Sequence, residues 1–238
     1  MAERMADASP RRLARVSGVL FLVTLLTGVF AEIFVSDRLV VGGDATATAA
    51  NILANQSLYR LGFTAYLVEM ACNVAFTALF YQLLRPAGRS VSWVALTLGL
   101  VGCTIKTVSR LFYIAPLLVL EGPPYLRAFS TDQSQALALL MLRVNGLGAG
   151  MALAFFGFST LLNGYLIIRS GFLPRFLGAL SLLGGLGWLT FLSPPLGYRL
   201  FPYVAAFGLL ASAGMIGWLL IVGVNEPRWK ERAGIAGL

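Results

Sequence analysis

The chain has 238 residues, of which 58% are hydrophobic and only 12% are charged. A soluble domain usually carries about 25% charged residues, so this composition excludes an ordinary water-soluble domain and indicates a protein surrounded by lipid. The absence of His excludes His-ligated haem and the common His-containing zinc and copper sites. We expect no metal and no cofactor. The net charge of +8 is spread over the ends of apolar segments, which favours lipid headgroups over nucleic acid as partners.

Six apolar segments are long enough to cross a bilayer, which takes about 20 residues each. They cover roughly residues 16–35, 61–84, 92–115, 136–168, 174–192 and 201–224. The first follows a basic stretch and is too long for a typical signal peptide, so we expect it to be retained. The sequence therefore predicts an all-α, polytopic membrane helical bundle with six transmembrane helices. We expect residues 1–238 to form a single integral membrane domain.

The connection at residues 36–60 contains the stretch DATATAANILANQSLY. Its apolar positions, Ile52, Leu53 and Leu58, favour a short helix lying on the membrane surface. Asp44 or Thr46 is its expected N-cap, because short polar side chains satisfy the first free N–H groups of a helix.

The fourth segment has two recognisable local signals. Ser130 and Gln133 match a capping box that opens this helix. Further on, Gly146 and Gly150 form a GxxxG pair, which is typical of close packing between membrane helices.

Lys and Arg in the connections predict the orientation, because they gather on the cytoplasmic side. Alternating the six segments places eleven of them on one side and four on the other. Both termini are therefore expected in the cytoplasm. The eleven are Arg4, Arg11, Arg12, Arg15, Arg85, Arg89, Arg169, Arg175, Arg228, Lys230 and Arg232, and the four are Arg38, Arg60, Arg127 and Arg199.

Five charged residues fall inside the apolar segments, where an unpaired charge costs at least about 2.5–3.5 kcal/mol. Counting about 1.5 Å of helix rise per residue from the outer ends places all five in the outer half of the bilayer. Glu69 and Lys106 have nearly the same depth, and their side chains are expected to pair. The five are Glu32, Glu69, Lys106, Arg110 and Arg143.

These charges and their polar neighbours form a candidate binding site for an anionic small molecule or lipid. Three cations face two carboxylates, and the surplus positive charge would bind a carboxylate or phosphate. On this count, replacing Lys106 should harm folding less than replacing Glu69. The alternative is a set of ion pairs that only fixes the register of the helices. The candidate ligand-binding residues are Glu69, Lys106, Arg110, Arg143, Glu32, Asn73, Tyr66, Tyr113 and Asn145.

Two stretches of the sequence, GYLIIRSGFLPRFLG in the C-terminal half and GDATATAANI in the N-terminal half, resemble the bacterial membrane family called domain of unknown function 4386. The resemblance extends over nearly the whole chain. It implies a multi-pass protein of the bacterial plasma membrane, and it implies no activity.

Three kinds of function are compatible with these residues. The first is binding of an anionic small molecule or lipid, with transport as an extension of it. The second is an intramembrane enzyme acting on an apolar, isoprenoid-like substrate with Glu69 as acid or base. The third is a structural membrane protein without a ligand. The sequence contains no phosphate-binding loop, nucleophile triad or metal-ligand pattern that would favour a soluble-type hydrolase or ATPase.

Overall fold

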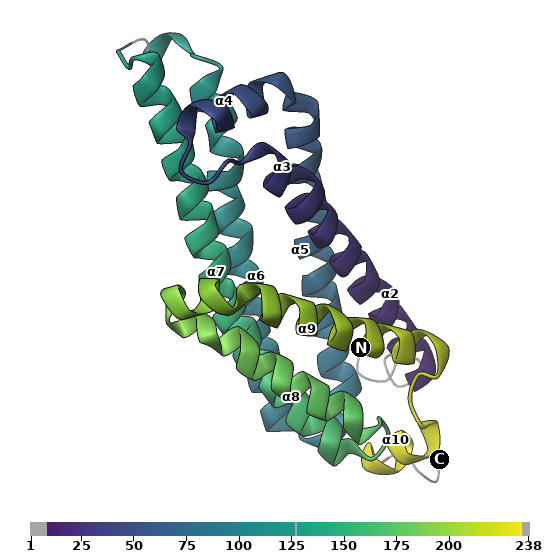
Figure 1. Ribbon diagram of the computed structural model, residues 1–238. Coiled ribbons are helices and arrows are strands. Elements are labelled where there is room, and N and C mark those ends of the chain that lie inside the picture. Colours follow the sequence, from purple (N-terminus) through teal and green to yellow (C-terminus); the bar gives the residue numbers. More distant parts are fainter. Residues whose placement is uncertain (1–8, 127, 235–238) are drawn as a thin grey trace. The chain divides into compact units, whose positions relative to one another are not determined.

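The computed structural model describes residues 9–126 and 128–234, and every regular element in this part of the chain is helical (Figure 1). The α-helices are α2 (Pro10–Val29), α3 (Asp37–Leu39), α4 (Ala45–Ala54), α5 (Gln56–Leu84), α6 (Arg89–Leu120), α7 (Thr131–Ser170), α8 (Arg175–Leu189), α9 (Pro194–Ile221) and α10 (Glu226–Arg232). A π-helical segment, η1 (Phe30–Ser36), joins α2 to α3. Three short 3₁₀ segments are η2 (Arg85–Ala87), η3 (Pro124–Leu126) and η4 (Thr190–Leu192).

The predicted fold class is confirmed, since six helices of the described chain are long and apolar enough to cross a membrane. These spans are Pro10–Leu39, Gln56–Ala87, Arg89–Leu120, Thr131–Ser170, Arg175–Leu192 and Pro194–Ile221. Only 22–39% of the most apolar window in each span is buried inside the protein. The remaining apolar surface would be costly in water and fits a lipid surrounding.

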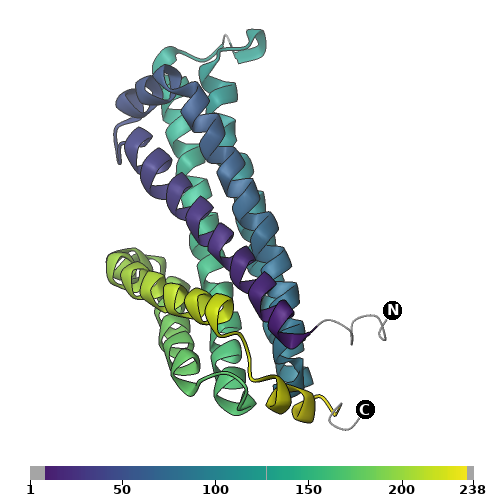
Figure 2. The same cartoon turned by 90° about the vertical axis from the view of Figure 1, so that its right-hand side faces the viewer.

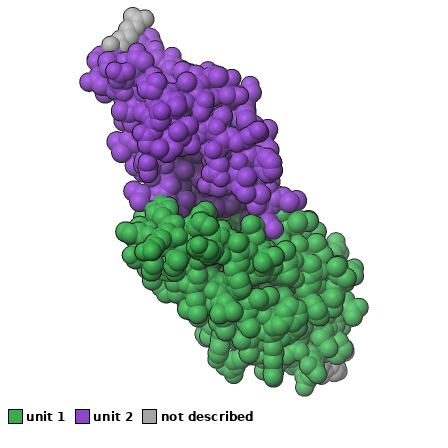
Figure 3. Space-filling model, in the orientation of Figure 1, with its two compact units in different colours: residues 1–23, 72–103, 151–238 green, residues 24–71, 104–150 purple. Residues whose placement is uncertain are grey.

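The chain divides into two compact units, which Figure 3 shows in different colours. Unit 1 comprises residues 1–23, 72–103 and 151–238, and unit 2 comprises residues 24–71 and 104–150. Helices α2, α5, α6 and α7 each contribute residues to both units.

Unit 1 contains α8 and α9, which lie side by side in both Figure 1 and Figure 2. Its core is aliphatic and aromatic, with fully buried Leu83, Leu166 and Leu177 among its largest members. Trp229 of α10 forms a hydrogen bond with the rest of this unit, donating its indole N–H to the carbonyl of Leu83 over 2.9 Å.

In unit 1, α7 and α8 approach each other at four glycines. A Cβ on Gly164 would lie 2.8 Å from the carbonyl oxygen of Gly178, and a Cβ on Gly157 would lie 3.0 Å from that of Gly185. The two glycines of each helix are seven residues apart, which places them on one face. This face lets the two backbones come into contact.

Unit 2 contains η1, α3 and α4, and its core is partly polar. Three tyrosines, Tyr59, Tyr66 and Tyr113, are at most 1% exposed and are packed among Val35, Ile52 and other apolar side chains. Burying a tyrosine hydroxyl is costly unless it is hydrogen-bonded, so this core requires an organised set of polar partners.

The predicted caps are present in unit 2. Asp44 caps α4 by accepting a 2.8 Å hydrogen bond from the N–H of Ala47. Thr46, the other expected cap, bonds instead to the side chain of Gln135 over 2.9 Å. Ser130 and Gln133 form the predicted capping box, with reciprocal bonds of 2.9 and 3.2 Å.

The predicted orientation can be tested with a matched pair of cysteines, Ser57→Cys and Ser90→Cys, in a variant lacking Cys72 and Cys103. Both serines are exposed and occupy the second position of a long helix. We expect a membrane-impermeant maleimide added to intact cells to label position 57 and not position 90. The opposite pattern would place the termini outside. Of the cations used for this prediction, Arg4 and Arg127 lie outside the described residues.

Candidate functional site

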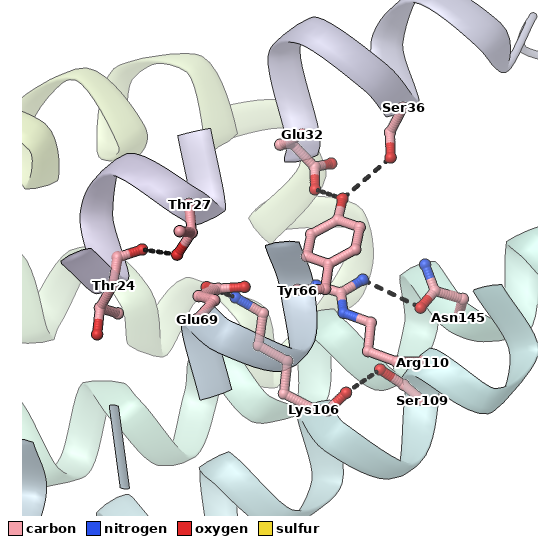
Figure 4. Close-up of polar contacts among 10 residues, drawn as sticks. All are labelled: Thr24, Thr27, Glu32, Ser36, Tyr66, Glu69, Lys106, Ser109, Arg110 and Asn145. Atoms are coloured by element: carbon pink, nitrogen blue, oxygen red, sulfur yellow. Dashed lines mark hydrogen bonds and ion pairs between the residues drawn. The ribbon is translucent and has the colours of Figure 1, made fainter. Parts of the chain in front are cut away.

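The first part of the site is an ion pair between α5 and α6. Lys106 Nζ lies 2.5 Å from Glu69 Oε1, and the two side chains are 16% and 8% exposed. This confirms the predicted pairing (Figure 4). Gly28 of α2 makes room for it, because a Cβ there would lie 3.0 Å from the same carboxylate oxygen. The second oxygen, Glu69 Oε2, is buried and has no hydrogen-bond partner in the described chain.

Tyr66 connects α5 to the π-helical segment η1. Its hydroxyl donates to Glu32 Oε2 over 2.6 Å. The oxygen of Ser36 lies 3.0 Å from the same hydroxyl. Because Tyr66 has a single hydroxyl proton, Ser36 is the donor in the second bond. Glu32 is exposed, while Tyr66 is only 1% exposed, so this chain of bonds runs from the surface of unit 2 into its interior.

The π-helical turn supplies both residues that bind Tyr66. Its hydrogen bond runs from the N–H of Asp37 to the carbonyl of Glu32, five residues back instead of four. Such turns are rare and occur frequently at functional sites. The turn therefore marks this end of the first span as unusual in backbone as well as in side-chain chemistry.

Arg110 of α6 lies beneath Tyr66. Its guanidinium carbon is 3.5 Å from the centre of the Tyr66 ring, and its Nη1 donates to Asn145 Oδ1 of α7 over 3.1 Å. The residue is only 2% exposed. Within the described residues Arg110 forms no ion pair, and its buried Nε has no hydrogen-bond partner. A buried cation is thus held by an aromatic face and a neutral amide (Figure 4).

Tyr113 and Tyr59 complete the interior of the site. Their rings stack with centroids 4.5 Å apart, and the Tyr59 hydroxyl donates to the carbonyl of Tyr113. Pro116, inside α6, disturbs the hydrogen bonds of the preceding helical turn, and neighbouring groups commonly compensate for this in membrane helices. The Tyr113 hydroxyl is buried and has no hydrogen-bond partner in the described chain. It packs against Gly62, where an added Cβ would lie 2.9 Å from the hydroxyl oxygen.

Two predicted site residues are not brought into these contacts. Arg143 is exposed, whereas Asn145, two residues further along α7, bonds to Arg110. Asn73 belongs to unit 1, where its backbone carbonyl accepts a 2.7 Å bond from Thr77. The network in unit 2 therefore contains two carboxylates, Glu32 and Glu69, and two cations, Lys106 and Arg110. The third cation that the sequence placed in the site, Arg143, lies at the surface.

Ser36, Tyr59, Gly28 and Gly62 are site residues that the sequence did not single out. Tyr59 could have been found from its position seven residues before Tyr66, on the same face of α5. The described chain has no group of three or more Cys, Asp or Glu side chains that could hold a metal ion.

A family model described as Domain of unknown function (DUF4386) matches residues 16–223. The match covers most of the chain, so the chain belongs to this family. Comparisons with curated proteins and with solved structures gave no match. The description of the family names no activity, and an assignment of function has to come from the site.

Proposed function

We propose that this membrane protein binds an anionic group, a carboxylate or phosphate of a small molecule or lipid, at Arg110 of unit 2. The observation that carries the proposal is the buried guanidinium whose contacts are neutral. A charge in a membrane span costs at least about 2.5–3.5 kcal/mol, and such residues usually take part in function. An anion at Arg110 would offset that cost.

The guanidinium has donors available for such a ligand. Arginine carries five N–H donors, and the structure gives Arg110 one hydrogen bond, to Asn145. Carboxylate and phosphate oxygens accept two parallel bonds from a guanidinium, and these are about twice as strong as bonds between neutral groups. An anion is therefore a better partner for Arg110 than the Asn145 amide.

Tyr66 contacts both the buried Arg110 and the exposed Glu32. Tyr66 covers the guanidinium with its ring and is held by hydrogen bonds to Glu32 and Ser36. Binding of an anion at Arg110 therefore requires the Tyr66 ring to move away from the guanidinium. Transport would require a further path through the protein, so binding is the activity that we propose.

The two alternatives are less well supported. An intramembrane enzyme would need Glu69 as a proton donor, and its 2.5 Å contact with the Lys106 ammonium works against that role. A purely structural network explains the Glu69–Lys106 pair but not a buried arginine without a carboxylate partner in the described chain.

We place the activity in the bacterial plasma membrane, which the family resemblance implies. We also propose that both units belong to one membrane domain, because four helices contribute to each.

Arg110→Gln and Arg143→Gln form a matched pair for testing this function. Both remove one positive charge, from a buried and an exposed arginine respectively. The purified protein in detergent is heated with and without a panel of anions, namely mono- and dicarboxylates, inorganic phosphate and an anionic phospholipid. An anion at about 100 times its Kd would stabilise the parent by about 2.7 kcal/mol. We expect Arg110→Gln to abolish this shift in Tm and Arg143→Gln to keep it.

Two results would contradict the proposal. One is a parent protein that no anion stabilises. The other is an Arg110→Gln variant that keeps the same shift in Tm as the parent.

A further inference from the structure

Unit 1 contains a cavity of about 730 Å³. Four segments of the chain line it: the start of α2, the turn between α7 and α8, the end of α9 and the turn before α10. None of the residues of the Arg110 site is among them. The lining residues include Arg11, Phe172, Arg175, Trp218, Glu226 and Arg228.

The walls of this cavity are fixed by hydrogen bonds between its turns. The N–H of Asn225 donates to the carbonyl of Phe172 over 3.0 Å, and Arg228 Nη1 donates to the carbonyl of Gly171 over 3.1 Å. Gly171 and Gly223 have φ angles of +71° and +75°, which favour glycine and define the two turns. The cavity is thus a built feature of the fold.

The charges that line the cavity are unequal. Three arginines face one carboxylate, that of Glu226. The hydroxyl of Ser9, 2.7 Å away, holds the pKa of the Glu226 carboxyl below its usual range, with Arg11 contributing to the same effect, so Glu226 is ionised at neutral pH. Arg11 Nε is 4.0 Å from this carboxylate, and the described chain supplies no ion-pair partner for Arg175 or Arg228. Two positive charges therefore remain uncompensated at the cavity.

The apolar part of the lining indicates what kind of molecule carries the anion. Phe172, which is only 3% exposed, and Trp218 both line the cavity, and Trp218 packs edge-on against Phe176. Tryptophan is enriched where membrane proteins meet lipid headgroups, because its ring is apolar and its N–H is polar. A cavity lined by arginines and by apolar side chains fits a phosphate group that is attached to a less polar molecule.

We propose that this cavity binds the phosphate of an anionic phosphoester, either a lipid headgroup or a soluble glycerol phosphate. Guanidinium groups bind phosphate oxygens through paired hydrogen bonds, and three of them around one cavity favour phosphate over a single carboxylate. The site is independent of Arg110, since the two share no residue.

The test compares two double variants of the full-length protein in detergent. Arg11→Gln/Arg175→Gln removes two arginines of the cavity. Arg85→Gln/Arg89→Gln removes two exposed arginines elsewhere in unit 1 that do not line the cavity. Arg11 has only a surface ion pair, and its loss should change folding little. Binding of phosphatidylglycerol and of phosphatidylcholine is measured by native mass spectrometry.

We expect the parent to bind phosphatidylglycerol at least about tenfold more tightly than phosphatidylcholine. The affinity for phosphatidylglycerol should fall about tenfold in the cavity variant, Arg11→Gln/Arg175→Gln, and less than about twofold in the control variant, Arg85→Gln/Arg89→Gln. Equal losses of affinity in the two variants would mean that general surface charge attracts the lipid, and this would overturn the proposal. Equal binding of the two lipids by the parent would overturn it as well. Glycerol 3-phosphate is then added as a competitor. Displacement of the lipid identifies a soluble phosphoester as sufficient, and retention identifies the whole lipid as the ligand.

Discussion

Replacing Lys106 by methionine is expected to lower the free energy of unfolding by about 3–5 kcal/mol, because it leaves the Glu69 carboxylate buried without its cation. Glu69 is 8% exposed and one of its oxygens already lacks a partner in the described chain. Glu69→Gln should cost less, since Lys106 is 16% exposed and its long side chain can move its ammonium toward the surface. The measurement is unfolding in mixed micelles with increasing denaturing detergent.

The double variant Glu69→Gln/Lys106→Met is the control for this prediction. Because it removes both charges together, it should recover more than half of the stability that Lys106→Met loses. If the double variant instead loses the sum of the two single losses in free energy of unfolding, the 2.5 Å contact between Lys106 and Glu69 contributes nothing to stability. The prediction would then be wrong. Counting charges in the sequence predicted the opposite order of the two single variants. The structure reverses our expectation because the buried Glu69 has Lys106 as its ion-pair partner, while the third cation of the count, Arg143, is exposed and does not relieve the loss.

Depth along a helix was predictable from the sequence, while the face of the helix that points into the protein was not. A rise of about 1.5 Å per residue was enough to bring Glu69 and Lys106 to the same level. The same counting placed Arg143 and Asn145 together. Residues two apart point to nearly opposite sides of a helix, and only Asn145 reaches Arg110.

The spans were predictable because hydropathy over about 20 residues reflects transfer into lipid. The ends of the first four spans were placed too far inward; the fourth, for example, was expected at 136–168 and runs over Thr131–Ser170. Helices continue beyond the apolar stretch as long as caps and tertiary contacts satisfy their backbone, and here the Ser130–Gln133 capping box sets the start.

The π-helical turn at Phe30–Ser36 had no signal in the sequence. The five-residue hydrogen bond lies in the same segment whose Glu32 and Ser36 side chains bond to Tyr66, a contact between two helices. A pattern of residue types along one helix does not contain this information. Ser36 was therefore missed, although Glu32 and Tyr66 were both identified as candidates.

Close helix packing at Gly146 and Gly150 stays a prediction. The α7–α8 contact, which the sequence did not single out, has a different spacing. Gly157 and Gly164 of α7 meet Gly185 and Gly178 of α8, and the two glycines of each helix are seven positions apart. A search for GxxxG does not detect this spacing, which corresponds to two helical turns. The functional consequence is that α8, whose first residue is Arg175 of the phosphate cavity, is positioned by backbone contact.

Gly164→Ala is expected to lower the free energy of unfolding by about 1–3 kcal/mol, the usual cost of overpacking, although alanine is the better helix former. The added Cβ would lie 2.8 Å from the carbonyl oxygen of Gly178 and 2.9 Å from the N–H nitrogen of Leu182. Both are backbone atoms, so no side-chain rotation relieves the clash. The matched control is Gly214→Ala in α9, where nothing lies within 4 Å of the new methyl group and stability should stay level or rise. Thermal unfolding of the two variants in detergent compares them directly. Equal Tm values would mean that α7 and α8 separate at no cost, and the glycine contact would then not determine the position of α8.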